Sequence, residues 1–187
     1  MLDLGTTFLQ SVERSPHALA LVDSGVRLTY AQWHEQIGRT VTGLQRLGLG
    51  RGDRLLSLLQ NRHQAATLHW ACQFLGVVNV PLNWRAKSDE IDYCLADAEA
   101  KAVFFDASSE EATGASGGAR ALPRIGVGPL ESKDSTCDWE ALLAGPASPL
   151  QAAADAEDLS LMLYSSGTTG KPKGVPRRHR QERAAAL

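Results

Sequence analysis

The chain has 187 residues, of which 43% are hydrophobic and 21% are charged, so it is long enough for one domain with a hydrophobic core. An aromatic content of only 6%, with abundant Ala and Leu, favours an α/β or helical domain over an all-β one. The net charge of −2 excludes a chain that is basic throughout. The positive charge is unevenly placed, because six of the 19 Lys/Arg follow residue 170 beside a single acid.

The cysteines and the apolar runs bear on compartment and membrane. Cys72, Cys94 and Cys137 are scattered, with no C-x-x-C pair and no Cys/His cluster at zinc spacing. This pattern indicates reduced thiols and a cytoplasmic location. Residues 1–16 lack a basic segment followed by an apolar run, so we expect no signal peptide. No segment approaches the ~20 consecutive apolar residues of a membrane span.

The apolar spacing up to residue 106 alternates between helical and strand periods. Strand-like runs after residue 53 are short and almost wholly apolar, as in "VVNVPL", which is typical of strands covered on both faces. Alternating strands and helices imply right-handed crossovers and therefore a parallel sheet. The expected elements are a helix at 2–13, strands at 18–23 and 26–29, a helix at 30–47, a strand at 54–60, a helix at 61–75, a strand at 77–82, a helix at 88–98 and a strand at 102–106.

Local signals mark the ends of these helices. Thr29 followed by Gln32 matches the pattern of a capping box at the start of the second helix. Asn61 and Ser88 are the expected N-caps of the next two helices. Gly48 is expected to supply the left-handed residue that ends the second helix.

Residues 107–157 are rich in Ala, Gly, Ser and Pro. We expect mobile surface connections there, interrupted by a short strand at 124–128 and a short helix at 138–144. The run "LSLMLY" at 159–164 then predicts a strand that returns to the sheet and leads into a glycine-rich loop. The expected fold class is α/β, with a parallel-rich sheet and flanking helices.

The run "YSSGTTGKPKGVPRRHR" at 164–180 concentrates glycines, hydroxyl groups and positive charge. Glycine allows backbone geometries in which successive N–H groups point inward and bind an anion. Hydroxyl groups add donors and can offer oxygen to Mg²⁺. Residues 164–174 therefore predict a phosphate loop, with MgATP as the preferred ligand. The candidate phosphate-binding residues are Ser165, Ser166, Gly167, Thr168, Thr169, Gly170, Lys171, Pro172, Lys173 and Gly174, with Thr168 and Thr169 as candidate Mg²⁺ ligands.

This loop does not match the Walker A pattern G-x-x-x-x-G-K-[ST]. Pro172 stands where that pattern needs Ser or Thr, and Ser165 stands where it needs the first glycine. A second glycine-containing stretch, "GLGRGD" at 48–53, precedes a predicted strand and has the wrong spacing for G-x-G-x-x-G. We interpret it as a connection between a helix and a strand.

The loop and two earlier blocks resemble the adenylate-forming superfamily, which includes the acyl-CoA and aryl-CoA ligases. "YSSGTTGKPKGV" is similar to the phosphate-binding signature of that family. "LTYAQWHEQIGRTVTGLQRLGLGRGDRL" and "FLGVVNVPLNWRAKSDEIDYCLADAEAKAVFF" resemble its preceding blocks, in the same order and at similar spacing. The resemblance covers nearly the whole chain and implies the N-terminal part of the large domain of such an enzyme.

The resemblance also implies a two-step reaction. A carboxylate attacks the α-phosphate of ATP to give an acyl-adenylate and pyrophosphate, and a thiol, often coenzyme A, then displaces AMP. Ser165 through Gly174 would bind the β- and γ-phosphates with Mg²⁺ and stabilise the departing pyrophosphate. The expected ligands are therefore ATP, Mg²⁺, a carboxylic acid and coenzyme A, with no nucleic acid. No catalytic residue is assigned within the chain.

Two roles are open for His179, which lies where many members of the family have a histidine. It either begins the helix that contains "QERAAAL" or contacts a ligand, and the first role is favoured. Arg177, Arg178 and Arg180 are interpreted as a solvated basic face rather than as phosphate ligands. The pair Asp89/Glu90 is interpreted as a helix start rather than as general acids.

Later elements of the family have no counterpart in the chain, among them its ribose-binding aspartate and its C-terminal domain with a catalytic lysine. We therefore interpret residues 1–187 as a partial AMP-binding domain and expect the chain alone not to complete adenylation. A noncatalytic nucleotide-binding remnant remains an alternative. A basic arm for nucleic acid is disfavoured, because no aromatic residue follows Tyr164 to stack on bases.

Overall fold

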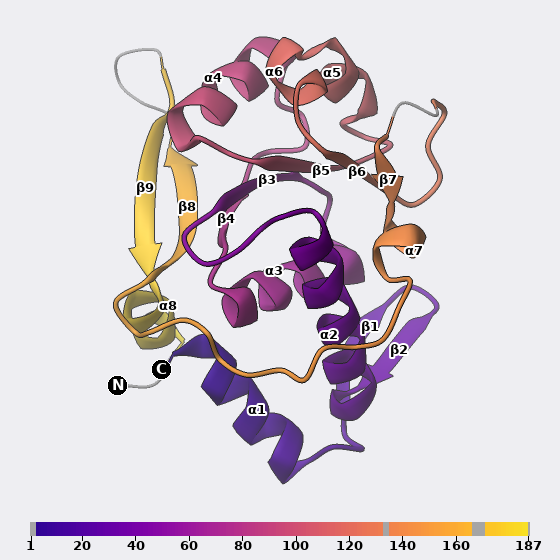
Figure 1. Ribbon diagram of the computed structural model, residues 1–187, viewed down its shortest axis with the longest axis vertical. Helices are drawn as coiled ribbons and strands as arrows, with labels where there is room; N and C mark the ends of the chain where they lie inside the picture. Colours follow the sequence, from indigo (N-terminus) through magenta and orange to yellow (C-terminus); the bar gives the residue numbers. More distant parts are fainter. Residues whose placement is uncertain (1–2, 133–134, 166–170, 187) are drawn as a thin grey trace.

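A seven-stranded sheet crosses the molecule, and a separate two-stranded hairpin lies at its edge (Figure 1). The computed structural model describes residues 3–132, 135–165 and 171–186. The strand order in the large sheet is β7-β6-β5-β3-β4-β8-β9. Its strands are β3 (Arg54–Leu58), β4 (Val78–Pro81), β5 (Ala102–Asp106), β6 (Arg124–Val127), β7 (Cys137–Asp138), β8 (Leu159–Ser165) and β9 (Lys173–Arg178), and the hairpin consists of β1 (Leu19–Asp23) and β2 (Val26–Thr29).

Six of the seven strands are parallel, which confirms the predicted parallel-rich α/β fold. β3 pairs with β4 on one side and with β5 on the other, so the chain changes direction across the sheet after β4. β8 extends the sheet in parallel beside β4, and β9 closes that edge as the antiparallel partner of β8. The carboxyl ends of the parallel strands therefore meet at one edge, where ligands of open α/β sheets usually bind.

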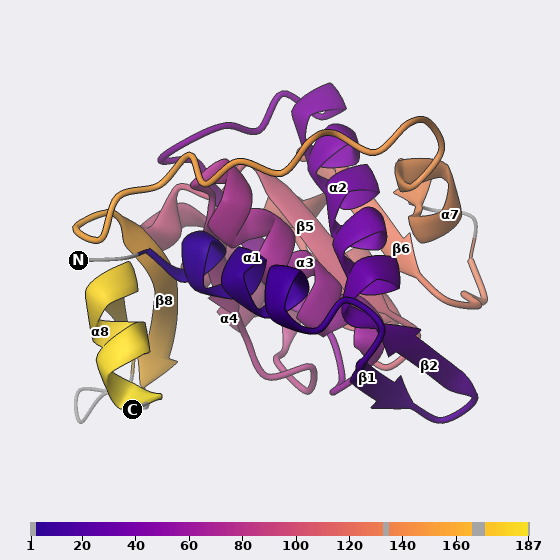
Figure 2. The ribbon, with the colours of Figure 1, turned by 90° about the horizontal axis from the view of Figure 1, so that it is seen from below.

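Helices cover both faces of the sheet (Figures 1 and 2). Adjacent residues of β5 show why the strand is apolar up to its last residue: Phe104 belongs to the core on one face and Phe105 to the core on the other. The first core is built on α1, α2, α3 and α7, and the second on α4 and α6. The helices are α1 (Leu4–Arg14), α2 (Tyr30–Arg46), α3 (His63–Leu75), α4 (Ser88–Ala98), α5 (Glu110–Ala115), α6 (Gly117–Arg120), α7 (Trp139–Leu142) and α8 (His179–Ala185).

The start of α2 confirms the predicted capping box. The Thr29 hydroxyl accepts a hydrogen bond from the Gln32 backbone N–H at 3.3 Å, and Gln32 Oε1 accepts one from the Thr29 N–H at 2.9 Å. Gly48 has φ +79°, the left-handed conformation expected after this helix. Trp33 of α2 is buried and packs edge-on against Phe8 of α1.

Two predicted helix caps are wrong. Asn61 does not cap α3, because the chain stays extended through Arg62 and the helix begins at His63. The first helical N–H, that of His63, instead donates to Asp23 Oδ2 at 2.8 Å, so the cap comes from the β1–β2 turn. Ser88 is the first residue of α4 rather than its N-cap, which is Lys87.

The region predicted to hold only surface connections, a strand and a helix carries more regular structure than expected. The predicted strand and helix are present as β6 and α7, but α5 and α6 also form within 107–122. Ser116 caps α6 and is fully buried, and its hydroxyl donates to Asp92 of α4 at 2.6 Å. Small residues let this segment approach α4 closely. In the sequence alone, the same Ala, Gly and Ser residues indicate a loop.

Candidate functional site

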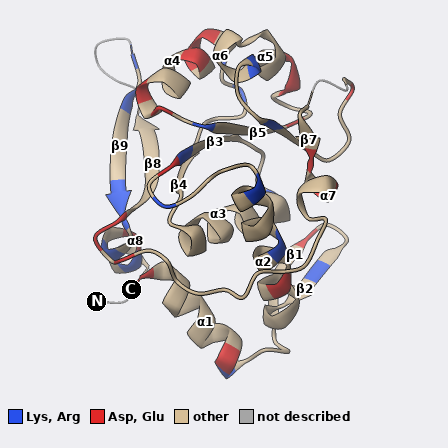
Figure 3. Cartoon of the chain, in the orientation of Figure 1, with Lys and Arg blue, Asp and Glu red and all other residues tan. Residues whose placement is uncertain are grey.

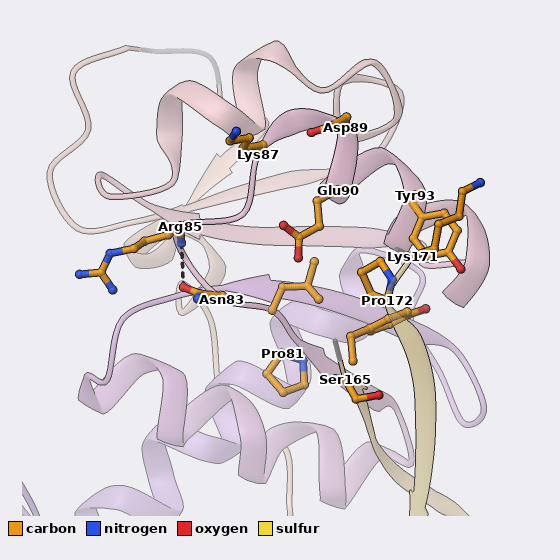
Figure 4. A pocket seen from close by; sticks show the side chains of 12 residues that line it. Pro81, Asn83, Arg85, Lys87, Asp89, Glu90, Tyr93, Ser165, Lys171 and Pro172 are labelled. Atoms are coloured by element: carbon orange, nitrogen blue, oxygen red, sulfur yellow. Dashed lines mark hydrogen bonds between the residues drawn. The ribbon is translucent and has the colours of Figure 1, made fainter. Parts of the chain in front are cut away.

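A cavity of about 850 Å³ lies at the carboxyl ends of β4 and β8, beside the N-terminal half of α4 (Figure 4). Three segments far apart in the sequence contribute to it: the turn after β4, the first turns of α4, and the two flanks of the predicted phosphate loop. Its lining residues are Pro81, Leu82, Asn83, Arg85, Lys87, Asp89, Glu90, Tyr93, Tyr164, Ser165, Lys171 and Pro172.

The turn after β4 is held by its own polar groups. Asn83 Oδ1 accepts a hydrogen bond from the Arg85 backbone N–H at 3.0 Å, drawn as a dashed line in Figure 4. The Leu82 N–H continues the strand pairing by donating to the Ser57 carbonyl oxygen at 2.9 Å. The Arg85 guanidinium lies 3.6 Å from the centre of the Trp84 ring, a cation–π geometry. This side of the cavity is therefore ordered and cationic.

Helix α4 brings acidic and aromatic groups to the opposite wall. Asp89 and Glu90 lie in its first turn, where carboxylates are favoured by the helix dipole. Figure 4 shows the Glu90 carboxylate directed toward the centre of the lining residues. Tyr93, one turn further on, presents its ring to Lys171, whose Nζ lies 5.4 Å from the ring centroid. The cavity thus contains both signs of charge.

The two flanks of the predicted phosphate loop meet at this cavity. Antiparallel pairing sets Ser165, the last residue of β8, opposite Lys173, the first residue of β9. Tyr164 is paired with Gly174, and its hydroxyl donates to Asp97 Oδ2 at 2.7 Å. Burial, together with this hydrogen bond, raises the pKa of Tyr164, so the phenol stays a neutral donor.

The structure brings part of the predicted site together. Ser165, Lys171 and Pro172 line the cavity, and Lys173 and Gly174 begin β9 beside it. A Cβ atom on Gly174 would lie 3.2 Å from Met162 Sδ, so a small residue suits this close approach. The other predicted residues, Ser166, Gly167, Thr168, Thr169 and Gly170, lie outside the described residues.

His179 lies away from the cavity lining and has a structural position. It is the first residue of α8 and is fully buried. Its Nδ1 accepts a hydrogen bond from the Leu4 N–H at 3.3 Å, and its own backbone N–H donates to the Asp158 carbonyl oxygen. Burial lowers the pKa of His179, which favours the neutral ring that this acceptor role needs. The geometry supports the role at the helix start.

The arginines after the loop are paired within the chain. Arg177 pairs with Glu182, while Arg178 and Arg180 both reach Glu157, Arg180 at 2.9 Å. Figure 3 shows the basic end of β9 near an acidic stretch of the chain. Their charge is therefore largely matched by local carboxylates rather than gathered on an open basic face.

Most of the lining residues were not predicted as site residues, among them the polar side chains of Asn83, Arg85, Lys87, Asp89, Glu90 and Tyr93. A usable signal existed, since they follow a buried parallel strand and so reach the carboxyl edge of the sheet. Glu90 does lie at a helix start as predicted, and it also faces the cavity. What the sequence could not show is that β8 would lie next to β4 and bring the loop to this turn.

Within residues 3–132, 135–165 and 171–186, no group of three or more His, Cys, Asp or Glu side chains is placed to hold a metal ion. None of the helices in the described part of the chain combines the length and apolarity needed to cross a membrane.

Comparison with known proteins adds to this geometry. Residues 8–187 match the family described as AMP-binding enzyme. Over 94% of its length the chain is 32% identical to a feruloyl-CoA synthase of an Amycolatopsis species, and over its full length it is 32% identical to the long-chain-fatty-acid–CoA ligase FadD13 of Mycobacterium tuberculosis. An anthranilate–CoA ligase solved with anthranoyl-AMP matches 96% of the chain, with a TM-score of 0.88 and 22% identity, and so shares its fold.

The mostly parallel sheet with flanking helices matches the N-terminal domains of adenylate-forming enzymes. The chain belongs to the AMP-binding enzyme family. It spans about a third of the length of the curated relatives it matches, 33% of the feruloyl-CoA synthase and 37% of FadD13.

Proposed function

We propose that this chain forms the ATP-phosphate-binding part of an AMP-forming carboxylate–CoA ligase. One observation carries the proposal: the two flanks of the glycine-rich loop meet at a cavity on the carboxyl edge of a sheet of the AMP-binding family. In such a site, donors and cations fixed around the triphosphate offset charge as the carboxylate attacks and pyrophosphate departs.

The described residues suggest a division of roles. Lys171 and Lys173 supply positive charge at the end of the loop, and Ser165 supplies a hydroxyl donor at its start. Pro172 restricts the backbone between the two lysines. Lys171 now lies over the Tyr93 ring, and a triphosphate oxygen would replace this weak cation–π contact with a stronger charge-assisted hydrogen bond.

Mg²⁺ is part of the proposal. The cavity wall offers oxygen donors from Asp89, Glu90 and Ser165, the ligand type that Mg²⁺ prefers. Because no group of three or more His, Cys, Asp or Glu side chains in the described part of the chain is placed to hold a metal ion, the ion would be held mainly by phosphate oxygens and water. It would neutralise charge on the β- and γ-phosphates. The predicted ligands Thr168 and Thr169 stay candidates.

The other substrates are proposed at the level of class. The named relatives are, by their names, a feruloyl-CoA synthase and a long-chain-fatty-acid–CoA ligase. We infer a carboxylic acid as the first substrate and coenzyme A as the thiol acceptor, in a cytoplasmic enzyme. We further infer that residues 1–187 alone bind nucleotide without completing adenylation.

The test is the dissociation constant for MgATP, measured with the purified chain. Replacing Lys171 and Lys173 with Ala together should weaken binding by at least roughly ten-fold, since two charge-assisted contacts are lost. Lys101→Ala is the matched control, because Lys101 pairs with Asp53 on the surface, away from the cavity. Equal affinity in all three proteins, or no MgATP binding by the wild type, would overturn the proposal.

A further inference from the structure

One face of helix α4 contacts both sides of the predicted phosphate loop. Tyr93 and Asp97 are four residues apart and so lie one above the other on the helix. Asp97 accepts a hydrogen bond at 2.7 Å from Tyr164, the first residue of the loop. Tyr93 lies under Lys171, in the second half of the loop, with 5.4 Å between Nζ and the ring centroid. One helix face therefore holds the end of β8 and the approach to β9.

Packing around Asp97 makes this contact specific. Met162 and Tyr164 alternate along β8 and both pack on the core beneath α4. Gly174, the cross-strand partner of Tyr164, has no side chain, and a Cβ there would lie 3.5 Å from Asp97 Oδ2. At that distance a Cβ would be in ordinary van der Waals contact, so the backbone of β9 lies directly beside the Asp97 carboxylate.

Asp97 is not among the residues that line the cavity, whereas Tyr164 and its neighbour Ser165 are. The hydrogen bond with Tyr164 therefore connects Asp97 to the cavity lining. Because β8 and β9 are paired at this point, fixing Tyr164 also fixes the backbone of Gly174 and of Lys173 beside it.

We propose that Asp97 is a positioning residue of the phosphate site. By accepting the Tyr164 hydrogen bond, it fixes the paired ends of β8 and β9 on α4 and so sets where Ser165 and Lys173 meet the nucleotide. This inference rests on the proposed function. Asp97 itself touches neither the nucleotide nor the carboxylic acid.

The test is a double-mutant cycle on the MgATP dissociation constant. Asp97→Ala and Tyr164→Phe should each weaken binding roughly three- to ten-fold, the value of one lost hydrogen bond. The double variant should bind MgATP as tightly as the single variant with the lower affinity, since both substitutions remove the same contact. Asp97→Asn keeps an oxygen acceptor for the phenol and should stay within about two-fold of the wild type. Glu99→Gln, at an exposed acid two residues further on, is the control.

A second readout separates positioning from stability. Amide hydrogen exchange without nucleotide should be faster at 162–165 and 173–175 in Tyr164→Phe, with the rest of the sheet unchanged. Variants that lose thermal stability but keep the wild-type affinity and local exchange would overturn the inference. Tyr164→Phe keeps the ring and its packing, so it serves if Asp97→Ala fails to fold. If the wild-type chain does not bind MgATP at all, the proposed function is refuted, and this inference is refuted with it.

Discussion

His179 is a fully buried ionisable side chain at the junction of α8 with α1. Burial lowers its pKa in the folded chain from the ordinary value of 6.5, although Asp3, Asp158 and Glu182 oppose the shift. The unfolded chain therefore binds more protons once the pH falls below about 6.5. Stability that is present above this pH is lost as the pH falls toward the lower pKa of the folded state.

This predicts the pH dependence of the unfolding free energy. Between about pH 6.5 and pH 5, where ordinary carboxylates stay ionised, the wild type should lose stability more steeply than His179→Gln. His69, whose pKa burial lowers to about 4, acts in the same direction and remains, so the slope is reduced rather than abolished. Urea unfolding at several pH values measures this, with the exposed His17→Gln as control. Equal slopes for wild type and His179→Gln would contradict the assignment.

Individual residues also show where local sequence signals are sufficient and where they fail. The capping box at Thr29 was predictable because both partners lie within four residues of each other. The cap of α3 was not, because its acceptor, Asp23, comes from a turn 40 residues earlier. Asn61 is a residue type that often caps helices, but in the folded chain Asp23 accepts the hydrogen bond at the start of α3.

At the scale of elements, the contact between α2 and α7 depends on a residue without a side chain. A Cβ atom at Gly43 would lie 2.5 Å from the Leu142 carbonyl oxygen and 2.6 Å from Leu142 Cγ. Gly114 in α5 is the matched case, because a Cβ there meets nothing within 4 Å.

The two glycines therefore predict opposite effects of the same substitution. Gly43→Ala should destabilise the chain by about 1–3 kcal/mol through overpacking. Gly114→Ala should be neutral or stabilise by up to about 1 kcal/mol, since Ala restricts the unfolded chain and favours the helix. Urea unfolding of both variants measures the difference. A Gly43→Ala variant as stable as Gly114→Ala would show that α7 does not pack on α2 in this way.

Element prediction succeeded where burial dictates composition. β3 to β6 were predictable as short apolar runs, because strands covered on both faces admit few polar residues. α5 and α6 were missed because Ala, Gly and Ser serve close helix packing as well as loops. Thr113 and Ala119 are fully buried in this segment, which no local pattern indicated.

At the scale of the whole molecule, the sequence predicts a phosphate-binding role for the glycine-rich loop, but it did not predict what surrounds the loop. The role stays a prediction, and it could be made because the glycines, hydroxyls and lysines of the loop are contiguous in the sequence. The opposite wall, with Arg85, Glu90 and Tyr93, depends on β8 entering the sheet beside β4. That placement is a property of topology, and it joins segments about 80 residues apart.

The central claim is that this edge of the sheet recognises the phosphates of ATP. The most direct measurement compares the dissociation constants of the wild-type chain for MgATP and for AMP by calorimetric titration. A site built around the β- and γ-phosphates predicts at least roughly ten-fold tighter binding of MgATP, since AMP lacks the groups that Lys171 and Lys173 would contact. Equal affinity for the two nucleotides, or binding of neither, would contradict it.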